Sequence, residues 1–215
     1  MPVTVPEPAQ LFLVTPLLSG TPAEMETLRA ALAAAPVACV LLRHAGHDGK
    51  ALVRQFGPLV QGAGAACLLE GDPRKATRAG ADGLQLRYDP DALADAIASL
   101  KPERIVGCAG LASRDDAMTA GELDVDYLLF GEAEPDGTWP DPAWTLERVD
   151  WWAEIFNVPC VGFAQGLAEV GPLAEAGADF VALGDAVFGD VRGPAAALAD
   201  AVAALARAAA LRAPA

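Results

Sequence analysis

The chain has 215 residues, 53% of them hydrophobic and 20% charged, which suits one well-packed domain over residues 1–215 rather than two. Its net charge of −14 and its scattered Lys and Arg residues disfavour nucleic-acid binding, because phosphate neutralisation supplies most of the affinity of such proteins. No apolar run approaches the roughly 20 residues that span a bilayer, and the N-terminus lacks the pattern of a signal peptide, so we expect a cytoplasmic protein that does not bind membranes.

Eight short apolar runs follow one another along the chain. They are Leu11–Thr15, Ala38–Leu42, Ala65–Leu69, Gly83–Leu86, Ile105–Cys108, Tyr127–Phe130, Pro159–Gly162 and Phe180–Leu183. Their hydrophobicity is nearly continuous rather than alternating, which is typical of parallel strands covered by helices. Cys39, Cys67, Cys108 and Cys160 all fall in these runs, without metal-ligand spacing, and we expect them to be buried and unpaired.

Helix-like segments separate most of the apolar runs. The expected helices begin after Thr21, near Pro73, after Asp89 and Ser113, over Trp144–Phe156 and Leu167–Ala176, and after Gly193-Pro194. Thr21 and Ser113 head capping-box patterns, and Asp89 precedes a Pro at the first helical position. The segment near Pro73–Ala79 leaves room only for a short helix.

A short phrase recurs where a helix-like segment passes into a strand-like one. It reads Gly80-Ala81-Asp82, then Gly177-Ala178-Asp179, with a looser copy at Leu123–Asp126. Repetition of such a helix-to-strand joint indicates a parallel α/β fold. Eight strands that alternate with about eight helices predict a (β/α)₈ TIM barrel with short loops.

An open doubly wound sheet is the alternative fold. It is disfavoured because Thr15–Gly20, after the first strand, contains no G-x-G-x-x-G phosphate loop. The longest loop, Glu132–Pro142, follows the sixth strand and is therefore expected over the mouth of the barrel. Trp139 lies in this loop and is a candidate lid residue, whereas the three later Trp residues are expected to pack in a helix.

Barrel enzymes bind their ligands at the C-terminal ends of the strands. The polar and glycine residues predicted there are Arg43, Glu70, Asp72, Arg87, Asp89, Gln165, Gly166, Gly184 and Asp185. Gly166 and Gly184 follow the seventh and eighth strands, where barrels often bind phosphate through backbone N–H groups. The alternative is purely structural: Arg43 and Arg87 would form ion pairs with Glu70 and Asp89 and do nothing more.

The order of several phrases resembles the thiamine phosphate synthase and thiazole tautomerase (TenI-like) family. The matching phrases are Leu11–Thr15 with L-Y-L-V-T, Val40–Arg43 with V-Q-L-R, Gly80–Leu86 with G-A-D-G-V-H-L, Ile105–Gly107 with I-I-G, Asp126–Gly131 with D-Y-I-G-F-G, Val158–Val161 with I-P-V-V, and Ala176–Asp179 with A-G-A-D. The resemblance spans nearly the whole chain and implies a (β/α)₈ barrel.

The resemblance also implies a reaction. Synthases of this family join a pyrimidine diphosphate to a thiazole phosphate and release pyrophosphate with Mg²⁺, and the tautomerases isomerise the thiazole precursor. When the roles of the family's residues are transferred to this chain, the resemblance implies that Arg43 is the catalytic residue that holds the pyrophosphate. Asp72 and Asp89 then replace the magnesium ligands. Glu70, Arg87, Gln165, Gly166, Gly184 and Asp185 complete the substrate- and phosphate-binding set.

Several positions depart from the family pattern. The Lys of Q-L-R-x-K is Ala45, the magnesium Asp after strand three falls on Gly71, and the tautomerase His falls on Leu111. The T-x-T-K loop after strand six has become Glu134–Thr138, without Lys. Because diphosphate transfer needs cations at the diphosphate oxygens, we expect weak synthase activity or none.

Three hypotheses therefore stand side by side. The first is a divergent synthase that uses Mg²⁺. The second is a non-catalytic or repurposed barrel that binds a small metabolite, and the third, less favoured, is a tautomerase-type isomerase. The sequence leaves a homodimer open.

Overall fold

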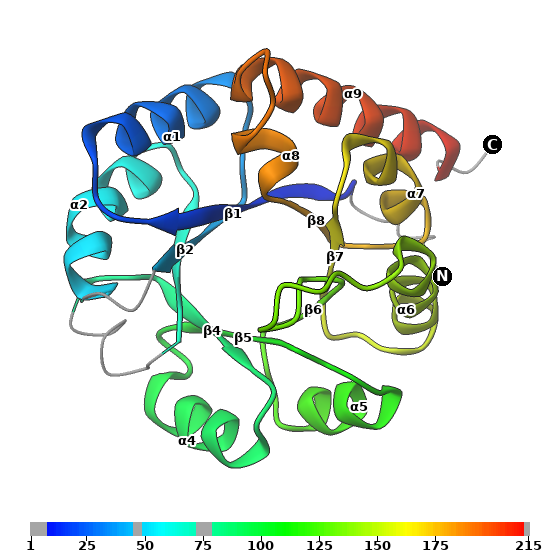
Figure 1. Ribbon diagram of the computed structural model, residues 1–215. Coiled ribbons are helices and arrows are strands. Elements are labelled where there is room, and N and C mark those ends of the chain that lie inside the picture. Colours follow the sequence, from blue (N-terminus) through cyan, green and yellow to red (C-terminus); the bar gives the residue numbers. More distant parts are fainter. Residues whose placement is uncertain (1–7, 45–48, 72–78, 213–215) are drawn as a thin grey trace, which may run out of the picture.

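Eight parallel strands close into a barrel in the computed structural model, which describes residues 8–44, 49–71 and 79–212 (Figure 1). The strands are β1 (Gln10–Leu18), β2 (Cys39–His44), β3 (Ala66–Glu70), β4 (Gly83–Arg87), β5 (Ile105–Ala109), β6 (Tyr127–Phe130), β7 (Cys160–Ala164) and β8 (Phe180–Leu183). Each strand pairs with the next in sequence, and β8 pairs with β1. The predicted TIM barrel is confirmed, and the open sheet is wrong.

The helices form a ring outside the barrel (Figure 1). They are α1 (Pro22–Ala34), α2 (Gly49–Gly62), α4 (Pro90–Leu100), α5 (Arg114–Glu122), α6 (Pro142–Ile155), α7 (Val170–Glu175), α8 (Asp185–Phe188) and α9 (Pro194–Arg212), with a 3-10 turn over Leu167–Glu169. The expected helix near Pro73–Ala79 lies almost wholly outside the described residues. The four-residue α8 was not predicted, because a single turn leaves no periodic pattern in the sequence.

Capping explains why α1, α4 and α5 begin where they do. The Thr21 and Ser113 side chains each accept the N–H of the residue three positions on, and Glu24 and Asp116 return a bond to the cap residue. Asp89 accepts the N–H groups of two residues in the first turn of α4. These bonds satisfy N–H groups that have no partner within the helix.

Alternation along the strands divides the core in two. One face packs against the helices, and the other fills the barrel with Phe12, Val14, Leu41, Leu68, Tyr127, Leu129, Val161 and Phe163 among others. Tyr127 reaches across the interior, where its hydroxyl donates to Gln85 Oε1 at 2.9 Å. The barrel is therefore a packed core, and ligands have access only at its ends.

The four cysteines are free, as predicted, and three of them are buried while Cys39 is half-buried. Trp144, Trp151 and Trp152 belong to α6, also as predicted. Trp152 is buried against Phe130 and Phe156, and the Arg114 guanidinium of α5 lies 4.7 Å from the Trp151 ring. Helix packing thus accounts for Trp151 and Trp152, and the Trp144 ring lies 5.1 Å from the Arg148 guanidinium of the same helix.

Helix α9 corrects one expectation from the sequence. Its 19 residues are long and apolar enough, by length and composition, to cross a membrane. In the structure the helix packs along α1, α7 and α8 on the outside of the barrel. Its buried face consists of Ala197, Leu198, Ala201, Ala204, Leu205 and Ala208. One face of the helix therefore packs in the helical ring.

Candidate functional site

Because side chains alternate between the two faces of a strand, three of the predicted site residues lie at the C-terminal mouth of the barrel. Arg43, Glu70 and Arg87 are each two positions beyond an interior residue, namely Leu41, Leu68 and Gln85. Alternate residues of a strand lie on the same face, so the three side chains continue the lining of the barrel into the opening. They stand at the ends of three neighbouring strands, β2, β3 and β4.

Arg43 and Glu70 form the expected ion pair. Arg43 Nε lies 3.5 Å from Glu70 Oε2, and the two side chains are 39% and 38% exposed. The Arg43 backbone N–H donates to the buried Thr15 hydroxyl at 3.0 Å, which ties the end of β2 to β1. A pair this exposed adds little stability, so the guanidinium can exchange its partner for a ligand at small cost.

Arg87 pairs with the loop after β6, not with Asp89 as the structural alternative supposed. Arg87 Nη2 lies 2.7 Å from Glu134 Oε2, and Nη1 lies 3.7 Å from Glu132 Oε1. The Asp89 carboxylate is engaged elsewhere, because its Oδ1 accepts the N–H groups of Asp91 and Ala92 at the start of α4. Helix capping therefore removes Asp89 as the partner of Arg87.

Glu132 is the most perturbed carboxyl of the mouth. Its side chain is 18% exposed, its Oε1 accepts the backbone N–H of Gly110, and Arg87 lies beside it. Burial raises the pKa of Glu132 to about 7, against the opposing effect of the Gly110 hydrogen bond and Arg87. Near neutral pH this group can therefore hold or release a proton, a property suited to acid-base chemistry.

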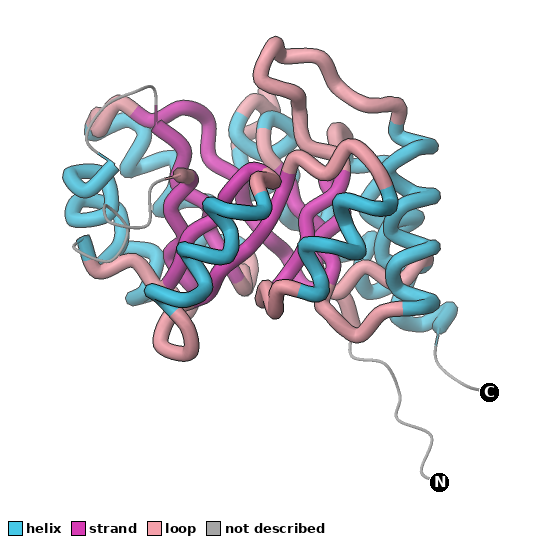
Figure 2. The backbone as a smooth tube through the Cα atoms, turned by 90° about the horizontal axis from the view of Figure 1, so that it is seen from below, coloured by secondary structure: helices cyan, strands magenta, loops and turns pink. Residues whose placement is uncertain are grey.

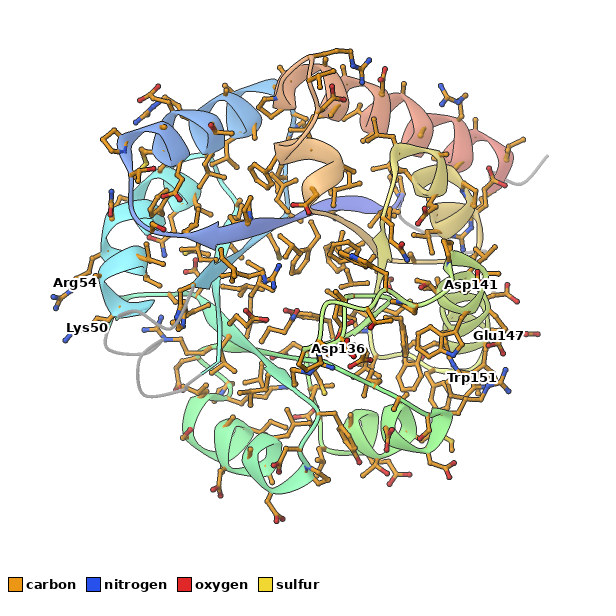
Figure 3. The ribbon with its side chains drawn as sticks, in the orientation of Figure 1. Lys50, Arg54, Asp136, Asp141, Glu147 and Trp151 are labelled. Atoms are coloured by element: carbon orange, nitrogen blue, oxygen red, sulfur yellow. The ribbon has the colours of Figure 1, made fainter. Side chains whose placement is uncertain are left out.

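The loop between β6 and α6 rises above the C-terminal ends of the strands, as predicted (Figure 2). The Glu134 N–H donates to the Thr138 carbonyl at 2.8 Å, which closes the tip of the loop into a turn. Figure 3 shows Asp136, at that tip, in front of the barrel opening. Two contacts hold the rest: Gln165 Nε2 donates to the Pro140 carbonyl at 2.7 Å, and the Trp139 ring lies 5.1 Å from the Phe163 ring.

Trp139 lies in the loop over the mouth, where the sequence suggested a lid residue. Its side chain is 42% exposed and covers Phe163, an interior residue of β7. Gln165, predicted to bind substrate, instead anchors this loop by its hydrogen bond to the Pro140 carbonyl.

The two glycines predicted to bind phosphate each have a carboxylate nearby. Gly166 precedes the 3-10 turn, and Glu169 of that turn accepts the Gln165 N–H at 2.9 Å. Gly184 precedes α8, and Asp185 opens that helix. A side chain at Gly184 would lie 3.2 Å from Phe163 Cζ, so glycine allows the backbone to approach the mouth closely. Negative charge at both places opposes phosphate binding there.

The predicted magnesium ligands are not brought together by the described residues. Asp72 lies outside them, and Asp89 caps α4. No group of three or more His, Cys, Asp or Glu side chains suited to a metal ion occurs within residues 8–44, 49–71 and 79–212. The prediction that Asp72 and Asp89 hold Mg²⁺ stays a prediction, and the described side chains alone do not make such a site.

Two hollows bear on the location of the site. The larger, about 940 Å³, lies at the opposite end of the barrel between the start of β1 and α9, and its lining residues carry no ionisable side chain. The smaller, about 340 Å³, lies at the mouth between the loops after β5 and β6, lined by Gly110, Leu111, Glu132, Glu134, Asp141 and Trp144 among others. We place the site at the mouth, since the charged and proton-binding groups are there.

From the sequence, Glu132 and Glu134 were placed in the loop over the mouth, but neither was assigned a role in the site. The only signal was their position directly after the sixth strand, in the longest loop. Their partner Arg87 is more than forty residues earlier, and the hydrogen bond to Gly110 comes from another strand end. No local pattern could have indicated either contact.

Comparison with known proteins identifies the family to which this sequence is similar. The family described as thiamine monophosphate synthase matches residues 11–187. The thiamine-phosphate synthase of Rhodospirillum centenum is 39% identical over 197 residues, which covers 89% of this chain and 95% of that protein. That of Erythrobacter litoralis is 34% identical over 210 residues, 92% of this chain and 97% of its own.

Solved structures show the same architecture. Thiamine phosphate pyrophosphorylase from Pyrococcus furiosus superposes with a TM-score of 0.77 at 20% identity, over 93% of this chain and 96% of that one. A 3-hexulose-6-phosphate synthase superposes with a TM-score of 0.67 at 19% identity, over 91% and 99%. At these identities the superpositions establish the fold alone.

Proposed function

This chain belongs to the thiamine monophosphate synthase family, and on that premise we propose that its barrel mouth binds a pyrimidine diphosphate and a thiazole phosphate and joins them to thiamine phosphate, with release of pyrophosphate. The observation that carries the proposal is Arg43, at the end of β2, in the place of the family's diphosphate-binding Arg. Its guanidinium faces the mouth, half-exposed, in a weak pair with Glu70.

In this proposal Arg43 stabilises the negative charge that develops on the leaving pyrophosphate. Trp139 covers the heterocyclic rings and excludes water from the mouth. The family uses Mg²⁺ to neutralise diphosphate charge, and Asp72 with Asp89 remains the predicted ligand pair. Because the described residues do not assemble a metal site, we assign no step to the ion.

We propose further that turnover is low. The described mouth presents two guanidinium groups, Arg43 and Arg87, each paired with a carboxylate. Further carboxylates, Glu169 and Asp185, stand beside the two glycines at the ends of β7 and β8. An incoming diphosphate must displace or tolerate these groups, which weakens its binding. Three more cations, Arg74, Lys75 and Arg78, follow β3 in the sequence, outside the described residues.

The pairing of both arginines with carboxylates also favours a second candidate, a barrel that binds a small metabolite without turning it over. A mouth in which the described arginines are already paired with carboxylates suits a neutral or cationic ring better than a diphosphate. The proposed location for either function is the cytoplasm.

A side-by-side assay separates the two candidates. Purified protein and the Rhodospirillum centenum relative receive the pyrimidine diphosphate, the thiazole phosphate and Mg²⁺, and thiamine phosphate is measured. We expect product at a lower rate than the relative, and a further loss of roughly 10²–10³-fold in Arg43→Ala. Arg114→Ala, which removes an exposed arginine between α5 and α6, is the matched control and should behave as wild type.

Each other result has a distinct meaning. Turnover equal to that of the relative would contradict the low-rate proposal while supporting the synthase. Absence of product, with a raised melting temperature in the presence of either precursor, would favour the binding barrel, because a ligand that binds only the folded state stabilises it. Absence of both would overturn both functions.

A further inference from the structure

Arg87 is held in one orientation at the mouth. A Cβ atom at Gly110 would lie 3.0 Å from Arg87 Cζ and 3.0 Å from Nη2, so the guanidinium lies against the Gly110 backbone. Gly110 has φ of +71°, a conformation that favours glycine. Arg87 Nη1 also donates to the Ala133 carbonyl at 3.4 Å. The guanidinium is therefore fixed in place, yet its side chain remains 40% exposed.

The two carboxylates beside Arg87 differ in how easily they can leave. Glu132 is largely buried and is fixed by the Gly110 N–H. Glu134 lies in the turn at the tip of the loop, is 54% exposed, and bonds to Arg87 Nη2 at 2.7 Å. An exposed ion pair of this kind contributes little stability, so Glu134 can move away by side-chain rotation alone.

We propose that Arg87 is an anion-binding residue, and that Glu134 occupies in the free protein the place that a substrate phosphate oxygen takes on Arg87. The inference deepens the proposed function, since it requires an anionic substrate at this mouth. A guanidinium fork binds phosphate and carboxylate oxygens in the same planar geometry, so the exchange preserves the hydrogen bonds of Arg87. Glu134 thereby competes with the substrate for Arg87.

Anion binding at Arg87 should also change the protonation of Glu132. The ionisable groups that interact with it electrostatically are Arg87 at the end of β4, Cys108 of β5, Tyr127 of β6 and Glu134 of the loop, and Asp141 lines the same hollow. Cys108 and Tyr127 stay protonated because burial raises the pKa of each far above neutrality. In the free protein Arg87 is shared by Glu132 and Glu134. When diphosphate replaces Glu134, the single negative charge of a carboxylate gives way to a more highly charged anion beside Glu132. Anion binding should therefore be accompanied by proton uptake at Glu132.

Calorimetric titration with inorganic diphosphate, on the full chain at low salt, tests the exchange. Glu134→Gln should bind diphosphate roughly 3–10-fold more tightly than wild type, and Arg87→Gln at least roughly tenfold more weakly. Arg87→Lys keeps the charge but loses the fork, and should lie between Arg87→Gln and wild type. Glu147→Gln is the matched control: Glu147 pairs with Arg114 on the outer ring, at similar exposure (Figure 3), and should leave the affinity unchanged.

The direction of the Glu134→Gln effect is decisive. If the ion pair merely holds the loop in place, Glu134→Gln and Arg87→Gln both weaken binding, and the exchange is overturned. Affinity that depends on Arg43 but not on Arg87 or Glu134 overturns the exchange and leaves the proposed function standing. Failure of diphosphate to bind any variant overturns both.

Proton uptake is measured by repeating the wild-type titration in buffers of different ionisation enthalpy. Glu132→Gln keeps an acceptor for the Gly110 N–H but cannot take up a proton. Protons that diphosphate itself takes up or releases are the same for both proteins, so the difference in proton uptake between them is due to Glu132. We expect greater uptake in wild type than in Glu132→Gln at pH 7.5, and equal uptake would contradict the linked protonation.

Discussion

Asp82, just before β4, and Cys67 of the neighbouring strand β3 are joined by two hydrogen bonds. The Asp82 N–H donates to the Cys67 carbonyl at 2.8 Å, and the Cys67 N–H donates to Asp82 Oδ2 at 2.7 Å. The same two bonds recur at the other joints, for the pairs Asp126 with Val106 and Asp179 with Cys160. The aspartate of the repeated phrase thus fastens the start of one strand to the strand before it, and its role is structural.

Removal of this carboxylate should destabilise the fold. Asp82→Ala leaves the Cys67 N–H without its acceptor at the partly buried end of the strand, and we expect a loss of about 1–3 kcal/mol in the free energy of unfolding. Asp82→Asn keeps an acceptor oxygen and should lose less. Urea denaturation measures both, with Asp95→Ala, an exposed aspartate of α4, as the control. Equal stabilities of Asp82→Ala and the control would contradict the role.

Gly107 leaves room for the Tyr127 ring inside the barrel. A Cβ atom at Gly107 would lie 2.0 Å from Tyr127 Cζ, and the ring is fixed by the bond from its hydroxyl to Gln85. Gly107→Ala should therefore lower the free energy of unfolding by about 3 kcal/mol or more. Gly57→Ala is the control, since its Cβ would meet the nearest side chain at 3.5 Å within α2, and helix propensity predicts slight stabilisation. Thermal unfolding distinguishes the two.

The carboxyl of Glu132 should make stability depend on pH. Its pKa is about 7 in the folded protein, above the usual 4.5, so the folded state binds more protons between these values. The contribution of Glu132 to stability is fully present below about pH 4.5 and is lost as pH rises through 7, by at most about 3 kcal/mol.

Glu132→Gln should remove that fall. The measurement is the difference in unfolding free energy between wild type and variant from pH 5 to pH 8.5. Glu122→Gln, an exposed position of α5, provides the comparison. A difference that stays constant across this range would show that Glu132 is not the titrating group.

The cysteines should be unreactive while the protein is folded. Burial raises the pKa of Cys67, Cys108 and Cys160 to about 12 and that of Cys39 to about 11, so almost no thiolate forms at pH 8. A thiol reagent should label the native protein slowly, with Cys39 first, and all four cysteines at once in denaturant. Rapid labelling of one thiol in the native state would point to an opening that the closed barrel does not have.

Much of the architecture could be predicted from local patterns. Apolar runs indicate buried strands, Thr21 and Ser113 mark helix starts, and the repeated joints indicate the parallel order. The pairing of Arg43 with Glu70 could also be predicted, because consecutive strands of a barrel are neighbours and residues at their ends must meet. In each case the physical cause lies within a few residues or follows from strand order.

The chemistry of the mouth was decided by tertiary structure. From the sequence, Arg87 and Gln165 were expected to bind substrate, and the structural alternative paired Arg87 with Asp89. In the fold, capping of α4 engages Asp89, and the loop after β6 supplies Glu134 to Arg87 and the Pro140 carbonyl to Gln165. A contact between distant segments depends on how a long loop settles over the barrel, which the pattern of neighbouring residues does not encode. The raised pKa of Glu132 has the same origin, because desolvation is a property of the folded surroundings and not of the residue.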